Sequence, residues 1–138
     1  MVNDYIEVED GQIYNLAYQI NVLVEKTINN DYEIIAKVIK EVLDFHSIYK
    51  ARIGDNIYIG RLIEAINNVP NVININSIRC FNKVSGNYSN NEMQTTFVNN
   101  DKTIKEIDLT DGTLYNSYDG IFEIKYNTDV KITISKLG

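Results

Sequence analysis

The first third of the chain is marked by apolar residues at the spacing of helical faces. Residues 12–28 place them three, four and seven positions apart, and a second stripe at four-residue intervals is formed by Tyr14, Tyr18 and Val22. A helix that is apolar on two sides usually has two neighbours, so this pattern predicts a buried helix. A further apolar stripe predicts another helix over residues 32–45. The short connection between the two predicts an antiparallel helix pair.

Residues 53–72, IGDNIYIGRLIEAINNVPNV, combine a short apolar run with an amphipathic segment. The run at 57–59 predicts an extended segment, and the apolar spacing that follows predicts a third helix from near Gly60. Pro70 cannot continue a helix because it lacks the amide hydrogen and its ring clashes with the preceding turn. The third helix is therefore expected to be short and to end sharply.

After this helix the apolar residues alternate with polar ones, which predicts β-structure. Ile73 and Ile75 share one parity, whereas Ile78 and Cys80 share the other. A strand cannot change parity without an extra residue. The pattern therefore predicts a bulge or bend near Asn76–Ser77.

The last third of the chain contains several shorter β-patterns. Weak strands are expected over 95–98, 104–109 and 113–115, the last of them after an Asp-Gly turn. Apolar residues alternate over 122–126 and again over 130–134. Because the three residues between these runs would place all their apolar side chains on one face, an antiparallel C-terminal hairpin is predicted.

Together these elements predict a single α+β domain over residues 1–138. An N-terminal antiparallel helix pair (11–46) and the short third helix pack on a mostly antiparallel sheet that ends in a β-hairpin. The third helix and the β region occupy 53–138. Residues 1–10 contain a short alternation, which is interpreted as an edge strand or as the remnant of an upstream region.

Composition and charge exclude some partners. The formal net charge is -6, and an acidic chain is repelled by phosphate, so nucleic-acid binding is not expected. The densest basic group lies within residues 37–52 and is interpreted as a solvated face. No apolar run approaches the roughly 20 residues of a membrane span, so membrane insertion is not expected. Cys80 is the single cysteine, which leaves no intrachain disulfide.

The residues that could carry chemistry are few. His46 is the single histidine, and its position at the end of the second predicted helix favours a capping or half-buried ring. Cys80 has the strand parity of an apolar neighbour, which predicts a buried and inert thiol. One histidine and one cysteine cannot form a structural zinc cluster, and Asp108 and Asp111 lack the other ligands of a calcium loop. No catalytic, cofactor-binding or metal-binding residue, no cofactor and no small-molecule substrate is therefore expected, and the chain is not expected to be an enzyme.

The positive signals concern contact surfaces. The chain has ten tyrosines and no tryptophan, and tyrosine suits protein interfaces because its body is apolar and its tip is polar. Two interpretations stay open, since several of these tyrosines could instead complete the core. The interface candidates are Tyr14, Tyr18, Val22, Tyr49 and Tyr88, and Tyr115 and Tyr118 also fall on expected exposed segments.

Six short segments follow one another along the chain: Ile53–Gly54, Ile57–Leu62, Val69–Val72, Asn82–Lys83, Phe122–Lys125 and Asp129–Val130. This series resembles the C-terminal region of phage baseplate wedge proteins related to the baseplate J family, over roughly residues 33–134. In two positions the chain departs from that pattern: Gly60 replaces a serine, and Asn71 replaces the glycine of a Val-Pro-Gly-Val turn. Asn tolerates the left-handed conformation better than other non-glycine residues, so the turn is expected to survive.

This resemblance implies a structural component of a phage tail baseplate that forms subunit interfaces in the wedge or the inter-wedge ring. The implied partners are other baseplate subunits and copies of the chain itself. The implied location is the virion tail, assembled in the bacterial cytoplasm. Family members are usually much longer, which implies an excised C-terminal domain or a reduced form. The alternative is a non-enzymatic protein-binding adaptor module from a mobile element.

Overall fold

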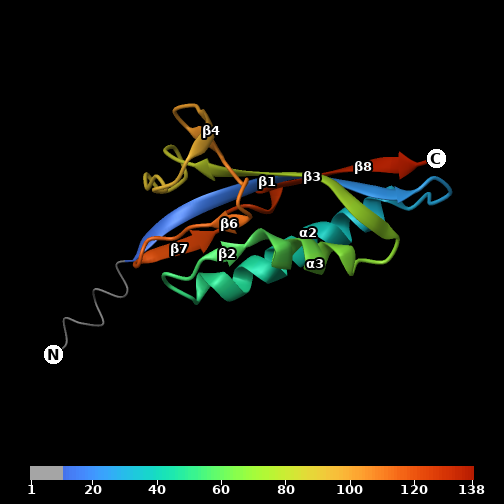
Figure 1. The fold of residues 1–138 in the computed structure, drawn as a ribbon, viewed down its shortest axis with the longest axis horizontal. Helices are drawn as coiled ribbons and strands as arrows, with labels where there is room; N and C mark the ends of the chain where they lie inside the picture. Colours follow the sequence, from blue (N-terminus) through green and yellow to red (C-terminus); the bar gives the residue numbers. More distant parts are fainter. Residues whose placement is uncertain (1–10) are drawn as a thin grey trace.

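The computed structural model describes residues 11–138, and its main sheet is built around one long central strand (Figure 1). This strand, β1 (Gln12–Glu25), pairs with β3 (Val72–Lys83) on one edge and with β7 (Gly120–Glu123) and β8 (Val130–Leu137) on the other. Two further strands, β5 (Ile104–Ile107) and β4 (Phe97–Asn100), extend the sheet beyond β3. The sheet is mixed, because β1 is antiparallel to β3 but parallel to β7 and β8.

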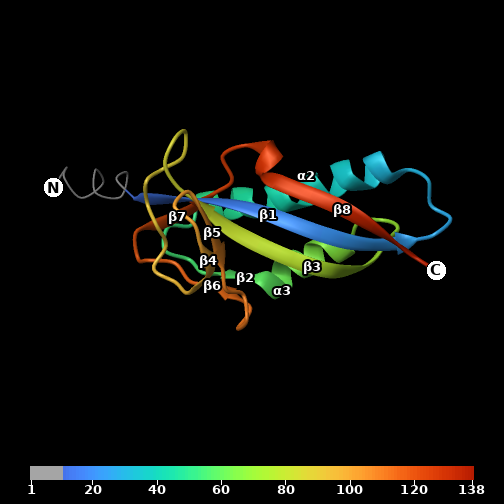
Figure 2. The same cartoon turned by 90° about the horizontal axis from the view of Figure 1, so that it is seen from above.

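Two helices cover one face of the sheet. The longer one, α2 (Asp31–Lys50), contacts β7 and β8, and the shorter one, α3 (Ile59–Asn67), packs beside α2 and against β3. Seen from above, β8, β1 and β3 lie in front of the two helices, so the sheet face turned to the viewer is the face that the helices do not cover (Figure 2). That face is lined by polar side chains, among them Gln19, Arg79 and Thr133. The core therefore lies between the sheet and the two helices.

The predicted N-terminal helix pair is wrong, because residues 12–25 form the central strand. Every even-numbered side chain of β1 from Tyr14 to Val24 is at most 2% exposed, whereas Gln19 and Glu25 are exposed on odd positions. Side chains of a strand alternate between its faces, so this two-residue period places one set of apolar residues on the helices. The stripe of Tyr14, Tyr18 and Val22 fits both templates, since a spacing of four is also a multiple of two.

The predicted C-terminal hairpin is also wrong, although its alternation is correct. Phe122, Val130 and Ile132 are buried as expected, but β7 and β8 lie end to end along the same edge of β1. Both run parallel to β1, which is longer than either of them and offers an edge to each in turn. A short 3-10 helix, η1 (Asn127–Asp129), lies where the hairpin loop was expected.

Other sequence predictions are confirmed. The register between β1 and β3 shifts where Asn21 faces Ser77 and Val22 faces Ile75, so the extra residue is at the predicted bulge. Asn71 has φ of 75°, the left-handed conformation expected of the turn after α3. The expected edge strand within residues 4–9 lies outside the described residues.

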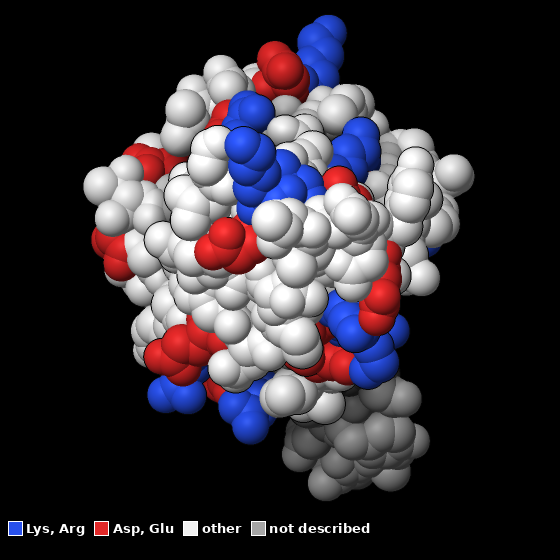
Figure 3. Space-filling view, turned by 90° about the vertical axis from the view of Figure 1, so that its right-hand side faces the viewer, with Lys and Arg blue, Asp and Glu red and all other residues white. Residues whose placement is uncertain are grey.

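Acidic and basic side chains are mixed on the surface of the protein. At the end of the molecule that faces the viewer in Figure 3, acidic and basic side chains are interspersed among uncharged ones. Between residues 11 and 138, no helix is long and apolar enough to cross a membrane.

Candidate protein-interaction surface

A two-stranded ribbon stands apart from the main sheet and carries exposed tyrosines. It consists of β2 (Ile57–Tyr58) and β6 (Thr113–Leu114), which pair antiparallel. Ile57 and Leu114 face each other and are fully buried, so the inner side of the ribbon belongs to the core. On the outer side, Tyr58 of β2 is 52% exposed, and Tyr115, which directly follows β6, is 49% exposed. The alternation of a strand thus anchors the ribbon with one set of side chains and presents tyrosines with the other.

Hydrogen bonds from Asn116 tie the two halves of the ribbon together. Its backbone N–H donates to Oδ1 of Asn56 at 2.8 Å, and its Nδ2 donates to the backbone oxygens of Asp55 and Gly120, each at 3.0 Å. The N–H of Gly54 also donates to the oxygen of Gly120, at 2.9 Å. These bonds hold the turn before β2 against the segment after β6.

Two glycines permit this close approach. Gly54 has φ of +85°, and a Cβ there would lie 2.7 Å from the backbone oxygen of Tyr118. A Cβ on Gly120 would lie 1.8 Å from Oδ1 of Asn116 and 2.7 Å from the ring of Tyr14. Real Cβ atoms do not approach so closely, so any other residue at either position would displace its neighbours. The backbone conformation of residues 53–60 is therefore held by packing against residues 111–120.

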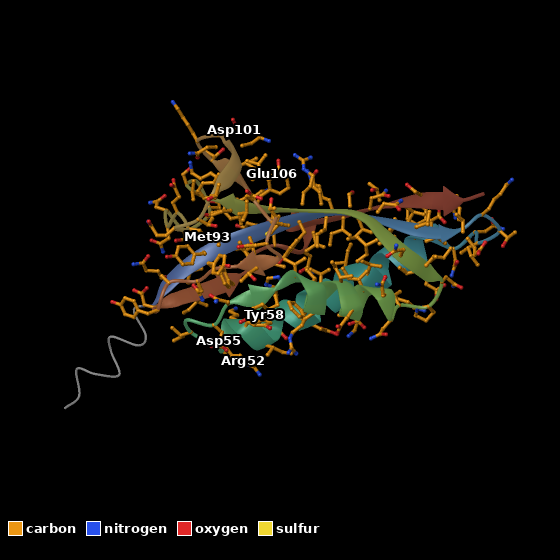
Figure 4. The ribbon with its side chains drawn as sticks, viewed as in Figure 1. Arg52, Asp55, Tyr58, Met93, Asp101 and Glu106 are labelled. Carbon is orange, nitrogen blue, oxygen red and sulfur yellow. The ribbon has the colours of Figure 1, made fainter. Side chains whose placement is uncertain are left out.

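The ribbon separates two surface hollows of opposite charge. One hollow, of about 490 Å³, is lined by Arg52, Arg61, Asp55 and Tyr58, and we call it the arginine hollow. Figure 4 shows Arg52, Asp55 and Tyr58 close together on the helix side of the molecule. Two of the three arginines of the chain lie in this hollow. Arg52 also lies over the ring of Tyr49, with its guanidinium carbon 5.8 Å from the ring centre.

The second hollow, of about 610 Å³, lies on the β6 side, and we call it the aspartate hollow. Asp108 and Asp111 line it together with Tyr115 and the three threonines Thr95, Thr96 and Thr110. No salt bridge within the described part of the chain includes Asp108, Asp111, Arg52 or Arg61. Within residues 11–138 these four charged side chains therefore have no ion-pair partner. We refer to the two hollows, together with Tyr58 and Tyr115, as the ribbon surface.

Both carboxylates of the aspartate hollow accept hydrogen bonds from neighbouring residues. The hydroxyl and the backbone N–H of Thr110 both donate to Asp108, and they hold the pKa of this carboxyl below its usual value. The hydroxyl of Tyr115 donates to Asp111 at 2.8 Å, and this bond raises the pKa of Tyr115. The carboxyl of Asp108 therefore carries its charge at neutral pH.

Most interface candidates from the sequence lie inside the chain. Tyr14, Tyr18 and Val22 are at most 2% exposed and Tyr49 is 8% exposed, so the alternative in which they complete the core describes them. Tyr88 is half-buried, and its hydroxyl donates to Asp129 at 2.9 Å. These side chains hold the fold together and are not gathered on one surface.

Of the other tyrosines, Tyr115 and Tyr118 were expected on exposed segments and are exposed. Tyr58, Arg52 and Arg61 were not selected from the sequence. The available signal for Tyr58 is that it stands between Ile57 and Ile59, the pattern of a strand with one outward side chain.

His46 and Cys80 meet in the core around Tyr18. The hydroxyl of Tyr18 and Nε2 of His46 are hydrogen-bonded at 2.6 Å, and Cys80 faces Tyr18 across the paired strands. Burial lowers the pKa of His46 to about 3 and raises the pKa of Cys80 to about 12. At neutral pH the imidazole is therefore uncharged and the thiol is protonated. Cys80 is buried as predicted, whereas His46 lies within α2 because this helix continues to Lys50.

Nothing in the described chain gathers three residues that could hold a metal ion. Comparison with protein-family models gives no match to this chain, and comparison with curated proteins gives none either.

Proposed function

We propose that this protein is a non-enzymatic structural subunit that contacts other proteins through the ribbon surface. The observation that carries the proposal is the grouping of exposed tyrosines with Arg52 and Arg61 on a rigid support. Neither arginine forms a salt bridge with another residue in 11–138. Tyrosine and arginine are enriched among the residues that dominate binding energy at interfaces. Tyr58, Tyr115 and Tyr118 are about half to nine-tenths exposed and have no core role of their own.

The rigidity of the ribbon supports a mechanical role. The bonds of Asn116 and the close approach at Gly54 and Gly120 fix the position of Tyr58 and Tyr115 before any partner arrives. A surface that is ordered in advance loses less conformational entropy on binding. Such a surface can hold a neighbouring subunit at a defined angle.

The burial of His46 and Cys80 supports the non-enzymatic part of the proposal. A catalytic Cys–His pair needs a thiolate and a nearby base in contact with solvent. His46 is 3% exposed and Cys80 is fully buried, and burial drives both toward their neutral forms.

The assembly we propose is a phage tail baseplate, located in the virion. This narrower proposal comes from the sequence resemblance to the baseplate J family. Two of the segments in that resemblance, Ile53–Gly54 and Ile57–Leu62, belong to the turn, strand and helix that carry the ribbon surface. A contact surface needs a defined shape, so these segments can be tightly specified without carrying a catalytic group.

The test is quantitative mass spectrometry of purified phage particles from a host that produces this chain. We expect the wild-type chain in the particles at a fixed ratio to the other tail proteins. The double variant Tyr58→Ala/Tyr115→Ala should fold but be excluded from particles, because it loses both outward tyrosines of the ribbon. The matched control is Tyr32→Ala on α2, where the tyrosine is 90% exposed and lies outside the ribbon surface.

Two results would contradict the proposal. One is that the wild-type chain is missing from purified particles, which would favour the alternative of an adaptor module if the chain then binds a non-virion protein. The other is that the double variant enters particles as efficiently as the wild type, which would remove the ribbon surface from the contact.

A further inference from the structure

The two hollows of the ribbon surface have opposite charges and flank the same tyrosines. On the β2 side, Arg52 and Arg61 outnumber the single acidic residue Asp55, and on the β6 side Asp108 and Asp111 are the charged residues of the hollow. Tyr58 lines the arginine hollow, and Tyr115 lines the aspartate hollow. Across the ribbon, the surface therefore changes from basic through aromatic to acidic.

We infer that the ribbon surface binds a second copy of this chain in a two-fold symmetric contact. The inference rests on the proposed role of the ribbon surface as a contact surface, and it names the partner. A two-fold axis through the tyrosines places the arginine hollow of one copy on the aspartate hollow of the other, and the reverse contact forms by symmetry. Tyr58 of one copy then meets Tyr115 of its neighbour.

Charge complementarity favours a second copy as the occupant. A two-fold contact uses the same surface on both subunits, so that surface must be complementary to itself. The four charges involved have no salt-bridge partner within the described part of their own chain, so docking loses no existing ion pair. Opposed charges of this kind orient partners and suppress wrong registers. Tilted or stacked tyrosine pairs at the centre add favourable aromatic contacts.

Two charge-reversal variants of the full chain test the contact by sedimentation velocity over a concentration series. Arg61→Glu places an acidic side chain against the partner's aspartate hollow, and Asp111→Arg places a basic one against the partner's arginine hollow. Each variant alone should dimerise at least about tenfold more weakly than the wild type, because like charges then face each other twice. An equimolar mixture of the two should dimerise again, because both reversed positions then meet opposite charges.

Controls separate the contact from folding and from net charge. Lys131→Glu makes the same change in charge as Arg61→Glu but lies on the polar face of the main sheet, so its dimerisation should equal that of the wild type. Asp111→Asn keeps the side-chain shape of the turn and removes the charge, so it should weaken dimerisation even if Asp111→Arg disturbs the fold. Thermal unfolding of each variant reports whether it is folded.

Each other outcome overturns the inference in a different way. A wild-type chain that is monomeric at every concentration overturns self-association, while the proposed function stands if particles still contain the chain. A dimer that neither variant weakens uses another surface. A mixture that fails to dimerise although each variant is folded excludes the two-fold pairing of the hollows.

Discussion

The tyrosines of the core and those of the ribbon are the same residue type in two opposite roles. Tyr18 is 1% exposed, and its hydroxyl is satisfied by His46 inside the protein. Tyr58 is 52% exposed and points away from the core. Both lie on strands, and the difference is which face of the strand the rest of the chain covers. A count of tyrosines therefore indicates interface potential only after the covered faces are known.

The largest expected difference between the two regions is in stability. We predict that Tyr18→Ala lowers the free energy of unfolding by about 3–5 kcal/mol, since it leaves a large cavity under the sheet and removes the partner of His46. Tyr58→Ala should change it by less than about 1 kcal/mol, because the side chain is half exposed. Urea denaturation of both variants measures the contrast, and equal losses would show that Tyr58 supports the core.

A pair of glycines tests whether the ribbon is as tightly constrained as the core. Gly120→Ala should destabilise the protein by about 1–3 kcal/mol, because the added methyl group meets Asn116 and Tyr14. Gly60→Ala is the matched control, since a Cβ there has no atom within 4 Å and the residue lies in α3. That control should be neutral or stabilising by up to about 1 kcal/mol. Thermal unfolding compares them, and an unaffected Gly120→Ala would mean that the ribbon can move.

The smallest predicted effect is the pH dependence of stability that comes from His46, the hydrogen-bond partner of the buried Tyr18. The folded-state pKa of His46 is about 3, below the ordinary 6.5, so the unfolded chain binds the proton more readily. This contribution to stability is fully present above pH 6.5 and is lost as the pH falls toward 3. Between pH 7 and pH 5.5 the free energy of unfolding should fall by about 1 kcal/mol from this group.

The control for the pH prediction is His46→Gln, which cannot titrate in this range. Its free energy of unfolding should be flatter than that of the wild type over the same interval, whatever its absolute value. Parallel curves for the two proteins would show that His46 does not stay neutral in the fold.

Several elements could be predicted from the sequence because local chemistry specifies them. Pro70 ends α3 in any context, and the change of parity between Ile75 and Ile78 demands a bulge wherever the strand pairs. The second predicted helix is present as α2, although it continues beyond its expected end to Lys50. Only part of the ribbon surface could be predicted from the sequence, because some of its tyrosines are far along the chain from the arginines that the fold places beside them.

The two wrong predictions, the N-terminal helix pair and the C-terminal hairpin, have one physical cause. The stripe at Tyr14, Tyr18 and Val22 fits a helix and a strand equally well, and only the edges offered by β3, β7 and β8 decide for the strand. For the C-terminal strands, alternation identified the buried face, but it does not say which neighbour receives the backbone hydrogen bonds. A hairpin and two parallel additions to β1 bury the same side chains.

By itself, the sequence determined where apolar faces lie, where α3 must stop and where β3 must bulge, because these follow from side-chain spacing and from proline and asparagine geometry. Only the tertiary structure decided that residues 12–25 are a central strand, and that residues 53–60 and 111–120 pack together to present tyrosines between opposite charges. Backbone donors and acceptors are the same for every residue except proline. The choice of strand partner therefore depends on how all the apolar faces fit into one core.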